Sequence, residues 1–125
     1  MRNITVVAEG NFWGCTSLRE LKNFHPTALN VDWRGNYTFC ECASLEEIDL
    51  SRVQLIPGSC FEGCTSLSNI NNMENVRYIG ARAFEYCNNL NIDLYLPNLG
   101  NEIGAEHYSG EIPYRTFRYT KIKSI

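Results

Sequence analysis

The sequence predicts a solenoid of about four to five turns, each built from a short parallel strand and a tight turn or 3₁₀ turn, mainly β with little helix. Two observations predict it: a motif that recurs at intervals of 22 to 33 residues, and an alternation of apolar and polar residues after it. The clearest copies are IPGSCFEGCTSLSNI at 56–70 and IGARAFEYCNNLNI at 79–92. A period of this size is typical of chains in which one turn cannot bury its own apolar side chains and must stack on the next.

Three residue types define the columns of the repeat. The five phenylalanines that belong to the repeat are separated by 27, 22, 23 and 33 residues; a cysteine lies three residues after each of the first four, and a leucine three residues further on. We expect these side chains to point inward and to line up as ladders. The columns are Phe12, Phe39, Phe61, Phe84 and Phe117, then Cys15, Cys42, Cys64 and Cys87, then Leu18, Leu45, Leu67 and Leu90, with an apolar residue five before Phe in four copies, Val7, Ile56, Ile79 and Ile112.

A short strand is predicted after each leucine of the repeat. Ile48 and Leu50 alternate with Glu47 and Asp49, which is typical of a strand with one buried face. We expect equivalent strands to start near Leu18, Leu67, Leu90 and Ile122 and to pair in parallel between turns. The segment around each phenylalanine lacks this alternation, which favours one tight helical or 3₁₀ turn.

The two clearest copies identify a family resemblance. GSCFEGCTSLSNI and GARAFEYCNNLNI resemble the BspA-like leucine-rich repeat, whose pattern is Ile-Gly, Ala-Phe, Cys, Leu and Ile, with two residues between each of these groups. The resemblance covers about residues 7–125 and is closest in the third and fourth copies. It implies a leucine-rich-repeat solenoid, and a surface or secreted adhesion protein that binds host or matrix proteins.

The whole chain, residues 1–125, is predicted to be a single leucine-rich-repeat domain. Residues 25–30 are expected to bulge on the loop side, and the insertion at 97–111, with three glycines and a proline, is expected to be a surface loop. Ile125 occupies a strand position with no polar cap after it, so the chain is either a fragment of a longer array or self-associates through an open end. The repeats are placed near 7–33, 34–55, 56–78, 79–111 and 112–125.

Charge and hydropathy exclude several classes of partner. With 125 residues, 44% hydrophobic content and a net charge of −3, the chain lacks the basic surface of a nucleic-acid-binding protein and any run that could insert into a membrane. Residues 1–9 lack the apolar run of a signal peptide, so the compartment stays open. The sequence has one loose group of basic residues, which is expected to form a solvated rim: Arg115, Arg118, Lys121 and Lys123.

The six cysteines are expected to be free thiols without a metal. Cys42 and Cys64 belong to the inward column and Cys60 takes the inward position of Ala83, whereas Cys40 is expected to face solvent and to react first with a thiol reagent. Four sulfurs that diverge in this way disfavour a zinc site. The position of Cys40 is shared by Trp13, Glu62, Glu85 and Arg118, which are polar or amphipathic.

Catalysis and cofactors are not expected. His25 and His107 lie in insertions; a Cys40–His25 nucleophile pair is conceivable, but the sequence indicates no third group or oxyanion donor for it, and surface histidines in loops are expected. The sequence contains no phosphate-binding loop and no nucleophile elbow. The chain is therefore predicted not to be an enzyme.

The outward face of the strands is the predicted site for a protein partner. This face would be moderately acidic and rich in amides, which favours a polar or basic partner. The other candidate is the 97–111 loop, with Tyr108. A recognition or adhesion module is the favoured function, and a structural spacer or assembly unit is the alternative. The predicted binding residues are Glu47, Asp49, Asn69, Asn71, Asn91, Asp93 and Tyr95, with Glu20 and Lys22 on the same face.

Overall fold

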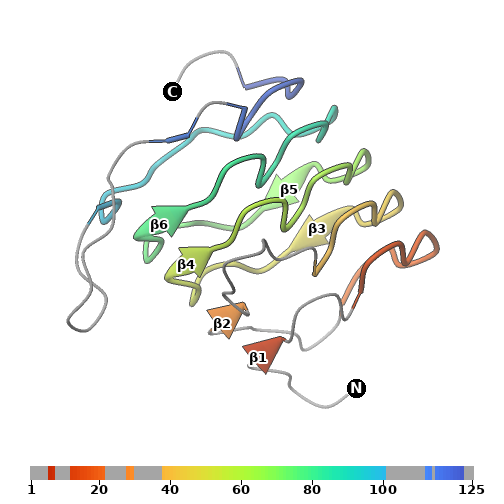
Figure 1. Cartoon of the computed structure of the whole chain (residues 1–125), viewed down its shortest axis with the longest axis horizontal. Coiled ribbons are helices and arrows are strands. Elements are labelled where there is room, and N and C mark those ends of the chain that lie inside the picture. The colour runs from red at the N-terminus through yellow and green to blue at the C-terminus, as the bar shows by residue number, and fades with distance from the viewer. Residues whose placement is uncertain are drawn as a thin grey trace.

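The computed structural model describes residues 6–7, 12–21, 28–29, 38–100, 112–113 and 115–122 (Figure 1). Across these ranges the chain forms short strands joined by tight turns, with no helix and hence none that could cross a membrane. The strands are β1 (Val6–Val7), β2 (Ala28–Leu29), β3 (Glu47–Ile48), β4 (Leu55–Ile56), β5 (Asn69–Ile70) and β6 (Tyr78–Ile79).

The strands pair in parallel, each with the corresponding strand of a neighbouring repeat. β1 pairs with β2, β3 with β5, and β4 with β6, and β2 also contacts β4. Figure 1 shows two rows that follow from this order, β3 and β5 in one and β1, β2, β4 and β6 in the other. The registers are Val6↔Ala28 and Val7↔Leu29, Glu47↔Asn69 and Ile48↔Ile70, and Leu55↔Tyr78 and Ile56↔Ile79.

The strand prediction is confirmed in two copies and incomplete elsewhere. β3 and β5 lie where the alternation after Leu45 and Leu67 places them, with Glu47 and Asn69 exposed and Ile48 and Ile70 buried. The described residues after Leu18 and Leu90 form no strand, and the residues after Ile122 lie outside the described ranges. The row containing β4 and β6 was not predicted, because a two-residue strand is too short to show alternation in the sequence.

The expected bulge at residues 25–30 is wrong at Ala28–Leu29. These residues form β2, and Leu29 pairs with Val7. Leu29 is therefore the residue of the second copy that is equivalent to Val7. Leu29 precedes its phenylalanine by ten residues, whereas Ile56 precedes Phe61 by five, so the extra length of this copy follows the strand.

A ladder of phenylalanine rings runs through the described repeats. Neighbouring ring centroids are 5.0, 5.2, 5.2 and 5.3 Å apart from Phe12 to Phe117, and neighbouring planes are within 5° of parallel. Phe39, Phe61 and Phe84 are fully buried. The predicted phenylalanine column is confirmed, and the cysteine and leucine columns of the three central copies are buried beside it.

Main-chain hydrogen bonds join one repeat to the next at each of these rings. The amide of Phe39 donates to the carbonyl of Cys60 at 2.9 Å, and the amide of Phe61 donates to that of Ala83 at 2.8 Å. The cysteine thiols add a second set of contacts, because each donates to a phenylalanine carbonyl one repeat earlier. These pairs are Cys42 to Phe12 at 2.8 Å, Cys64 to Phe39 at 3.0 Å, and Cys87 to Phe61 at 3.2 Å.

Neighbouring repeats approach each other closely at a pair of glycines, Gly58 and Gly80. A Cβ on Gly80 would lie 2.7 Å from the Cα of Gly58 and 2.8 Å from the carbonyl carbon of Pro57. Both contacts are to main chain, which cannot rotate away as a side chain can. Glycine at position 80 is therefore required by the spacing of the repeats rather than by its own backbone angles.

A left-handed residue follows each phenylalanine by two positions. In the first and third copies this residue is Gly14 or Gly63, but in other copies it has a side chain. A non-glycine residue in this conformation costs about 1–2 kcal/mol relative to the right-handed form. The φ values are 69° for Gly14, 60° for Glu41, 78° for Gly63, 65° for Tyr86 and 62° for Tyr119.

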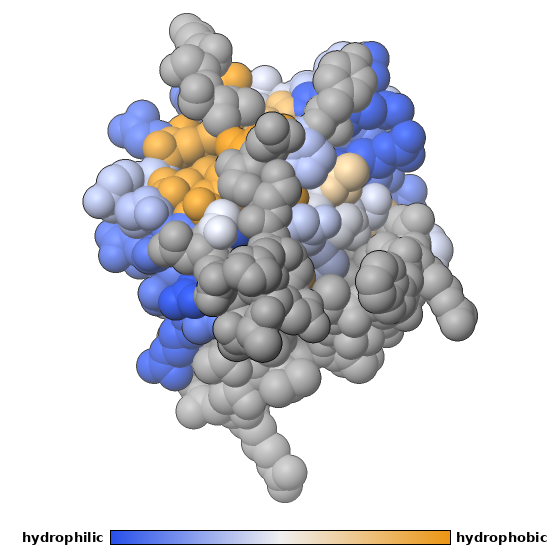
Figure 2. Space-filling model, turned by 60° about the vertical axis from the view of Figure 1, so that its left-hand side comes forward, coloured by the Kyte–Doolittle hydropathy of each residue, from blue (hydrophilic) through white to orange (hydrophobic). Residues whose placement is uncertain are grey.

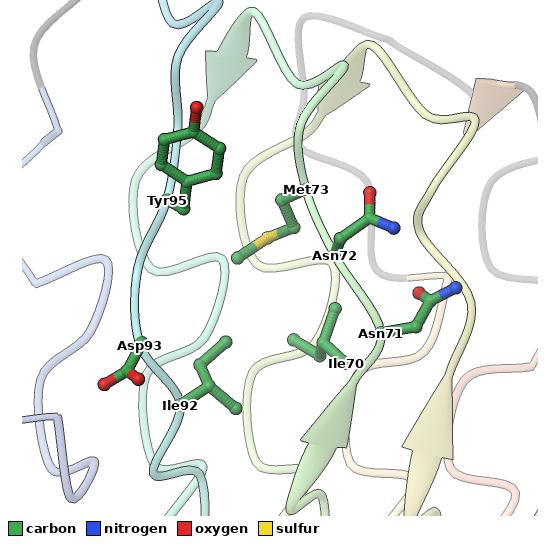
Figure 3. Close-up of a pocket in the computed structure, with 7 residues that line it drawn as sticks. All are labelled: Ile70, Asn71, Asn72, Met73, Ile92, Asp93 and Tyr95. Atoms are coloured by element: carbon green, nitrogen blue, oxygen red, sulfur yellow. The ribbon is translucent and has the colours of Figure 1, made fainter.

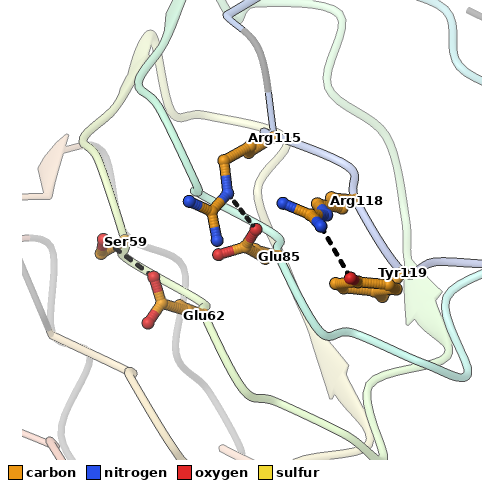
Figure 4. A network of polar contacts seen from close by, with 6 residues as sticks. All are labelled: Ser59, Glu62, Glu85, Arg115, Arg118 and Tyr119. Carbon is orange, nitrogen blue, oxygen red and sulfur yellow. Dashed lines mark hydrogen bonds and ion pairs between the residues drawn. The ribbon is translucent and has the colours of Figure 1, made fainter.

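Two residues expected to face solvent are buried. Cys40 is 4% exposed, because its short side chain lies in the turn column between the larger Trp13 and Glu62. Glu85 is 1% exposed and accepts a hydrogen bond from Nε of Arg115 at 2.7 Å, which joins the fifth copy to the fourth (Figure 4). The prediction for Cys40 is therefore wrong, and Cys15 is the most exposed of the six thiols.

Burial raises the pKa of the core thiols from their ordinary value of 9.0. The pKa rises to about 12 at Cys40 and Cys87 and to about 11 at Cys42, and it is also raised at Cys60 and Cys64. Loss of solvation of the thiolate is the largest cause at all five. All six cysteines are free thiols.

Replacing Phe61 with alanine should cost about 3–5 kcal/mol of unfolding free energy, because it removes a fully buried ring with a stacked neighbour on each side. Chemical denaturation measures the loss. Phe12→Ala is the matched control, since Phe12 is only partly buried and its loss should cost less. A loss below about 1 kcal/mol at Phe61 would mean that the ladder contributes little.

The raised thiol pKa values predict that the protein loses stability in alkali. The unfolded chain releases thiol protons near pH 9, whereas the folded chain holds them to higher pH, so stability is complete below pH 9 and falls as pH rises through the folded values. Each thiol contributes at most about 1.4 kcal/mol per pH unit. Guanidinium unfolding between pH 8 and 11, with a reductant, measures the slope. The slope should be shallower in Cys87→Ala, and an unchanged slope would contradict this account.

Candidate functional site

The predicted binding residues lie on the outer surface of the strand region. Tyr95 is 65% exposed and Asp49 is half-buried. Glu20 is also exposed, while Lys22 lies outside the described residues. The remaining predicted residues are exposed: Glu47, Asn69, Asn71, Asn91 and Asp93.

Asp49 and Asn71 are joined to each other and to the main chain. The Asn71 amide nitrogen donates to Oδ1 of Asp49 at 2.5 Å, and its Oδ1 accepts from the amide of Leu50 at 3.1 Å. The same Asp49 oxygen accepts from the amide of Ser51 at 3.0 Å and from its hydroxyl at 2.6 Å. These two side chains therefore hold the ends of neighbouring strands together, and their hydrogen-bonding capacity is partly used within the protein.

Strand pairing in the row that contains β3 and β5 ends after β5. No main-chain hydrogen bond joins residues 68–73 to residues 91–96, both of which the structure describes throughout. The spacing explains the break: Leu67 and Ile70 are three residues apart, but Leu90 and Ile92 only two. A shift of one residue reverses which side chains face the core, so the two segments cannot keep the β3–β5 register and bury Ile92 as well.

A pocket of about 130 Å³ lies at this opening. Figure 3 shows Ile70 and Ile92 directed into the space between the two segments, with Met73 beside them. Ile70 and Met73 are 5% and 4% exposed, so they form an apolar floor. The rim is polar. The full lining is Ile70, Asn71, Asn72, Met73, Ile92, Asp93 and Tyr95.

Three of the predicted residues meet at this pocket: Asn71, Asp93 and Tyr95. The side chains of Asp93 and Tyr95 have no hydrogen-bond partner within the described ranges, which leaves a carboxylate and a phenol available to a ligand. The pocket is smaller than the roughly 300–1,000 Å³ of typical small-molecule sites. It can therefore accommodate one side chain of a partner, held by polar groups at its rim.

The other predicted binding residues do not line this pocket. Glu47 and Asn69 are neighbours in the β3–β5 register; Asn69 belongs to the copy before that of Asp93, and Glu47 to the copy before that. Asn91 is exposed but does not line the pocket. Neither Asn72 nor the apolar floor of the pocket was identified from the sequence, because the repeat pattern gives no sign that the strand pairing ends here. The shortened Leu90–Ile92 spacing was the available signal.

The alternative loop at 97–111 is described only at its start. Asn98 donates its amide to the carbonyl of Glu74 at 2.6 Å, and the amide of Gly100 donates to Arg77 at 2.8 Å, so 97–100 is attached to the preceding repeat. Residues 101–111, with Tyr108 and His107, lie outside the described residues, as does His25. Within the described ranges, no group of three or more His, Cys, Asp or Glu side chains is arranged to hold a metal ion.

Comparison with known protein families identifies one family whose repeat matches this chain. The model of the family described as "BspA type Leucine rich repeat region (6 copies)" matches residues 1–113. Neither a curated protein nor a solved structure matches the chain. The family match covers most of the 125 residues and includes the cysteine and leucine columns and the phenylalanine column as far as Phe84. The chain belongs to the BspA-type leucine-rich repeat family.

Proposed function

We propose that this chain is a non-catalytic module that recognises a protein partner through its strand face. The observation that carries the proposal is the pocket after β5, where Asp93 and the 65%-exposed Tyr95 border a floor of Ile70, Met73 and Ile92. Exposed tyrosine beside a small apolar pocket is typical of residues that anchor a protein partner. Membership of the leucine-rich repeat family supports a binding role, and adhesion at a cell surface is the form of that role we favour.

We further propose a solenoid of four to five turns as the scaffold of this face. Five stacked phenylalanine rings support it, because they follow one another in the order of the sequence. The parallel pairing of β3 with β5 and of β4 with β6 supports it as well. Such a scaffold would present side chains of successive turns as an extended array to one partner.

The chemistry of the face favours a basic or polar extended segment. Three of the seven predicted binding residues are carboxylates, Glu47, Asp49 and Asp93, and none is cationic. An arginine or lysine of the partner could reach Asp93 while its aliphatic part covers the pocket floor. Unpaired amides on Asn69 and Asn91 would add hydrogen bonds along the strands.

Peptides selected from a displayed random library against the immobilised chain test this function. Binders should be enriched in Arg or Lys next to an apolar residue, and Asp93→Asn and Tyr95→Ser should each weaken them about tenfold with no change in the unfolding midpoint. Glu41→Gln is the control, because it also neutralises an exposed carboxylate but lies in the turn that follows Phe39. A variant shortened between residues 101 and 110 tests the loop: if this variant alone loses affinity for the selected peptides, the loop is the binding site. Failure to select any binder would favour the spacer function.

The alternative, an assembly unit, has its own observation. Phe12 and Leu18 in the first described copy, and Ile122 in the last, are only partly buried, whereas the equivalent residues between them are fully buried. Apolar surface of this kind can be covered by a second copy. Sedimentation velocity should then show dimers or larger species as concentration rises into the high micromolar range, and a strict monomer would count against assembly.

A further inference from the structure

The tight turns of the last two described copies carry an exposed aromatic pair. Tyr86 and Tyr119 are 43% and 48% exposed, and their rings stack with centroids 4.9 Å apart and planes 16° from parallel. The guanidinium of Arg118 lies 4.7 Å from the centre of the Tyr119 ring and donates to its hydroxyl at 2.8 Å (Figure 4). These turns lie along a different edge from the strands, at the blue and teal end of the row of turns in Figure 1.

The backbone at these tyrosines gives folding no reason to prefer an aromatic residue. Both occupy the left-handed position that Gly14 and Gly63 occupy in other copies. Glycine adopts this conformation without strain, whereas tyrosine does not. One exposed aromatic contact and one exposed cation–π contact together return no more stability than the two strained residues cost. Two tyrosines at positions where glycine suffices therefore point to a role in binding.

The same turns are basic in a chain whose net charge is −3. Residues 81–90 and 112–122 contain four cationic side chains and a single acid, Glu85. Glu85 is buried and paired with Arg115, so three exposed cations are left: Arg82, Arg118 and Lys121. Within the described part of the chain, the side chain of Arg118 contacts Tyr119 but no carboxylate.

We propose that this turn patch, formed by Tyr86, Arg118 and Tyr119 and accompanied by the exposed Arg82 and Lys121 of the same two segments, is a second docking surface that binds an acidic segment of a protein partner. The planar guanidinium, already oriented by Tyr119, can take a partner carboxylate through two parallel hydrogen bonds. The exposed Tyr86 ring takes an apolar or aromatic side chain next to that carboxylate. The charge of this patch is opposite to that of the strand face, so the two surfaces select different segments.

A protein is favoured over a nucleic acid by the extent of the charge. Three exposed cations can contact only a few phosphates of a nucleic acid. The rest of the chain is net acidic, which repels a long polyanion. A short acidic segment meets the patch without approaching the carboxylates of the strand face.

The test is a titration of the ¹⁵N-labelled chain with the peptide acetyl-Gly-Phe-Asp-Glu-Phe-Gly-amide, up to ~10 mM. Amide shifts should concentrate in residues 82–90 and 115–121. Arg118→Gln should weaken binding about tenfold, Arg118→Lys less, and Tyr86→Gly severalfold. Tyr95→Ser, on the strand face, is the control and should leave binding unchanged, so this result is independent of the proposed strand-face function.

Three outcomes would overturn the proposal. The first is the absence of localised shifts, or equal shifts with the charge-reversed peptide acetyl-Gly-Phe-Lys-Arg-Phe-Gly-amide. The second is an unfolding midpoint for Tyr86→Gly as low as that of Phe61→Ala, which would make the stack a folding element. The third is tighter binding of oligo(dT) through the same residues, which would assign the patch to nucleic acid.

Discussion

The distance between neighbouring repeats is the constraint on which the rest of the structure depends. Parallel strands hydrogen-bond at a separation of roughly 4.7–4.9 Å. The phenylalanine rings stack at 5.0–5.3 Å, which matches that separation closely enough for both to persist through the same repeats. Gly80 has no space for a Cβ beside Gly58 at this separation, and the cysteine thiols reach the preceding phenylalanine carbonyls because of it. The stacking of the rings, the pairing of the strands and the glycine at position 80 are therefore all set by the separation between neighbouring repeats.

This constraint acts on the interior and leaves the two outer edges free to vary. In the turns, the position after the ladder is filled by residues as different as Gly63 and Tyr86 with similar backbone angles. On the strand side, the loss of one residue between Leu90 and Ile92 ends the pairing and opens the pocket, yet Phe84 and Phe117 remain stacked. The candidate binding features therefore lie where a copy departs from the common pattern while the ladder continues.

The interior could be predicted from the sequence because its signal is periodic. Phe61, Cys64 and Leu67 follow one another at intervals of three residues, as do their equivalents in the neighbouring copies, and side chains at equivalent positions meet equivalent neighbours. The environments of Cys40 and Glu85 could not be predicted in this way. Glu85 is buried by Arg115, a partner thirty residues away across an insertion, and such a contact leaves no periodic trace.

The candidate site was predictable only in part for a related reason. Alternation placed Asp93 and Tyr95 on the outer face, and both are exposed there. It could not show that Asp49 would be held by Asn71 and Ser51, since those bonds depend on how adjacent copies meet. The position of β2 could not be predicted either. The second copy has no apolar residue five positions before its phenylalanine, and only the pairing of Leu29 with Val7 identifies the equivalent position.

The direction of the inter-repeat hydrogen bonds has a mechanical consequence. The bonds from Phe39 to Cys60 and from Phe61 to Ala83 join successive copies, so they lie roughly parallel to a force that pulls the first and last copies apart. Such a force acts on the interfaces in series, so each interface carries the same tension and the weakest one yields first. The copies should therefore separate one after another. Extension of this protein under tension should therefore be gradual, with each released copy adding length before the next interface yields.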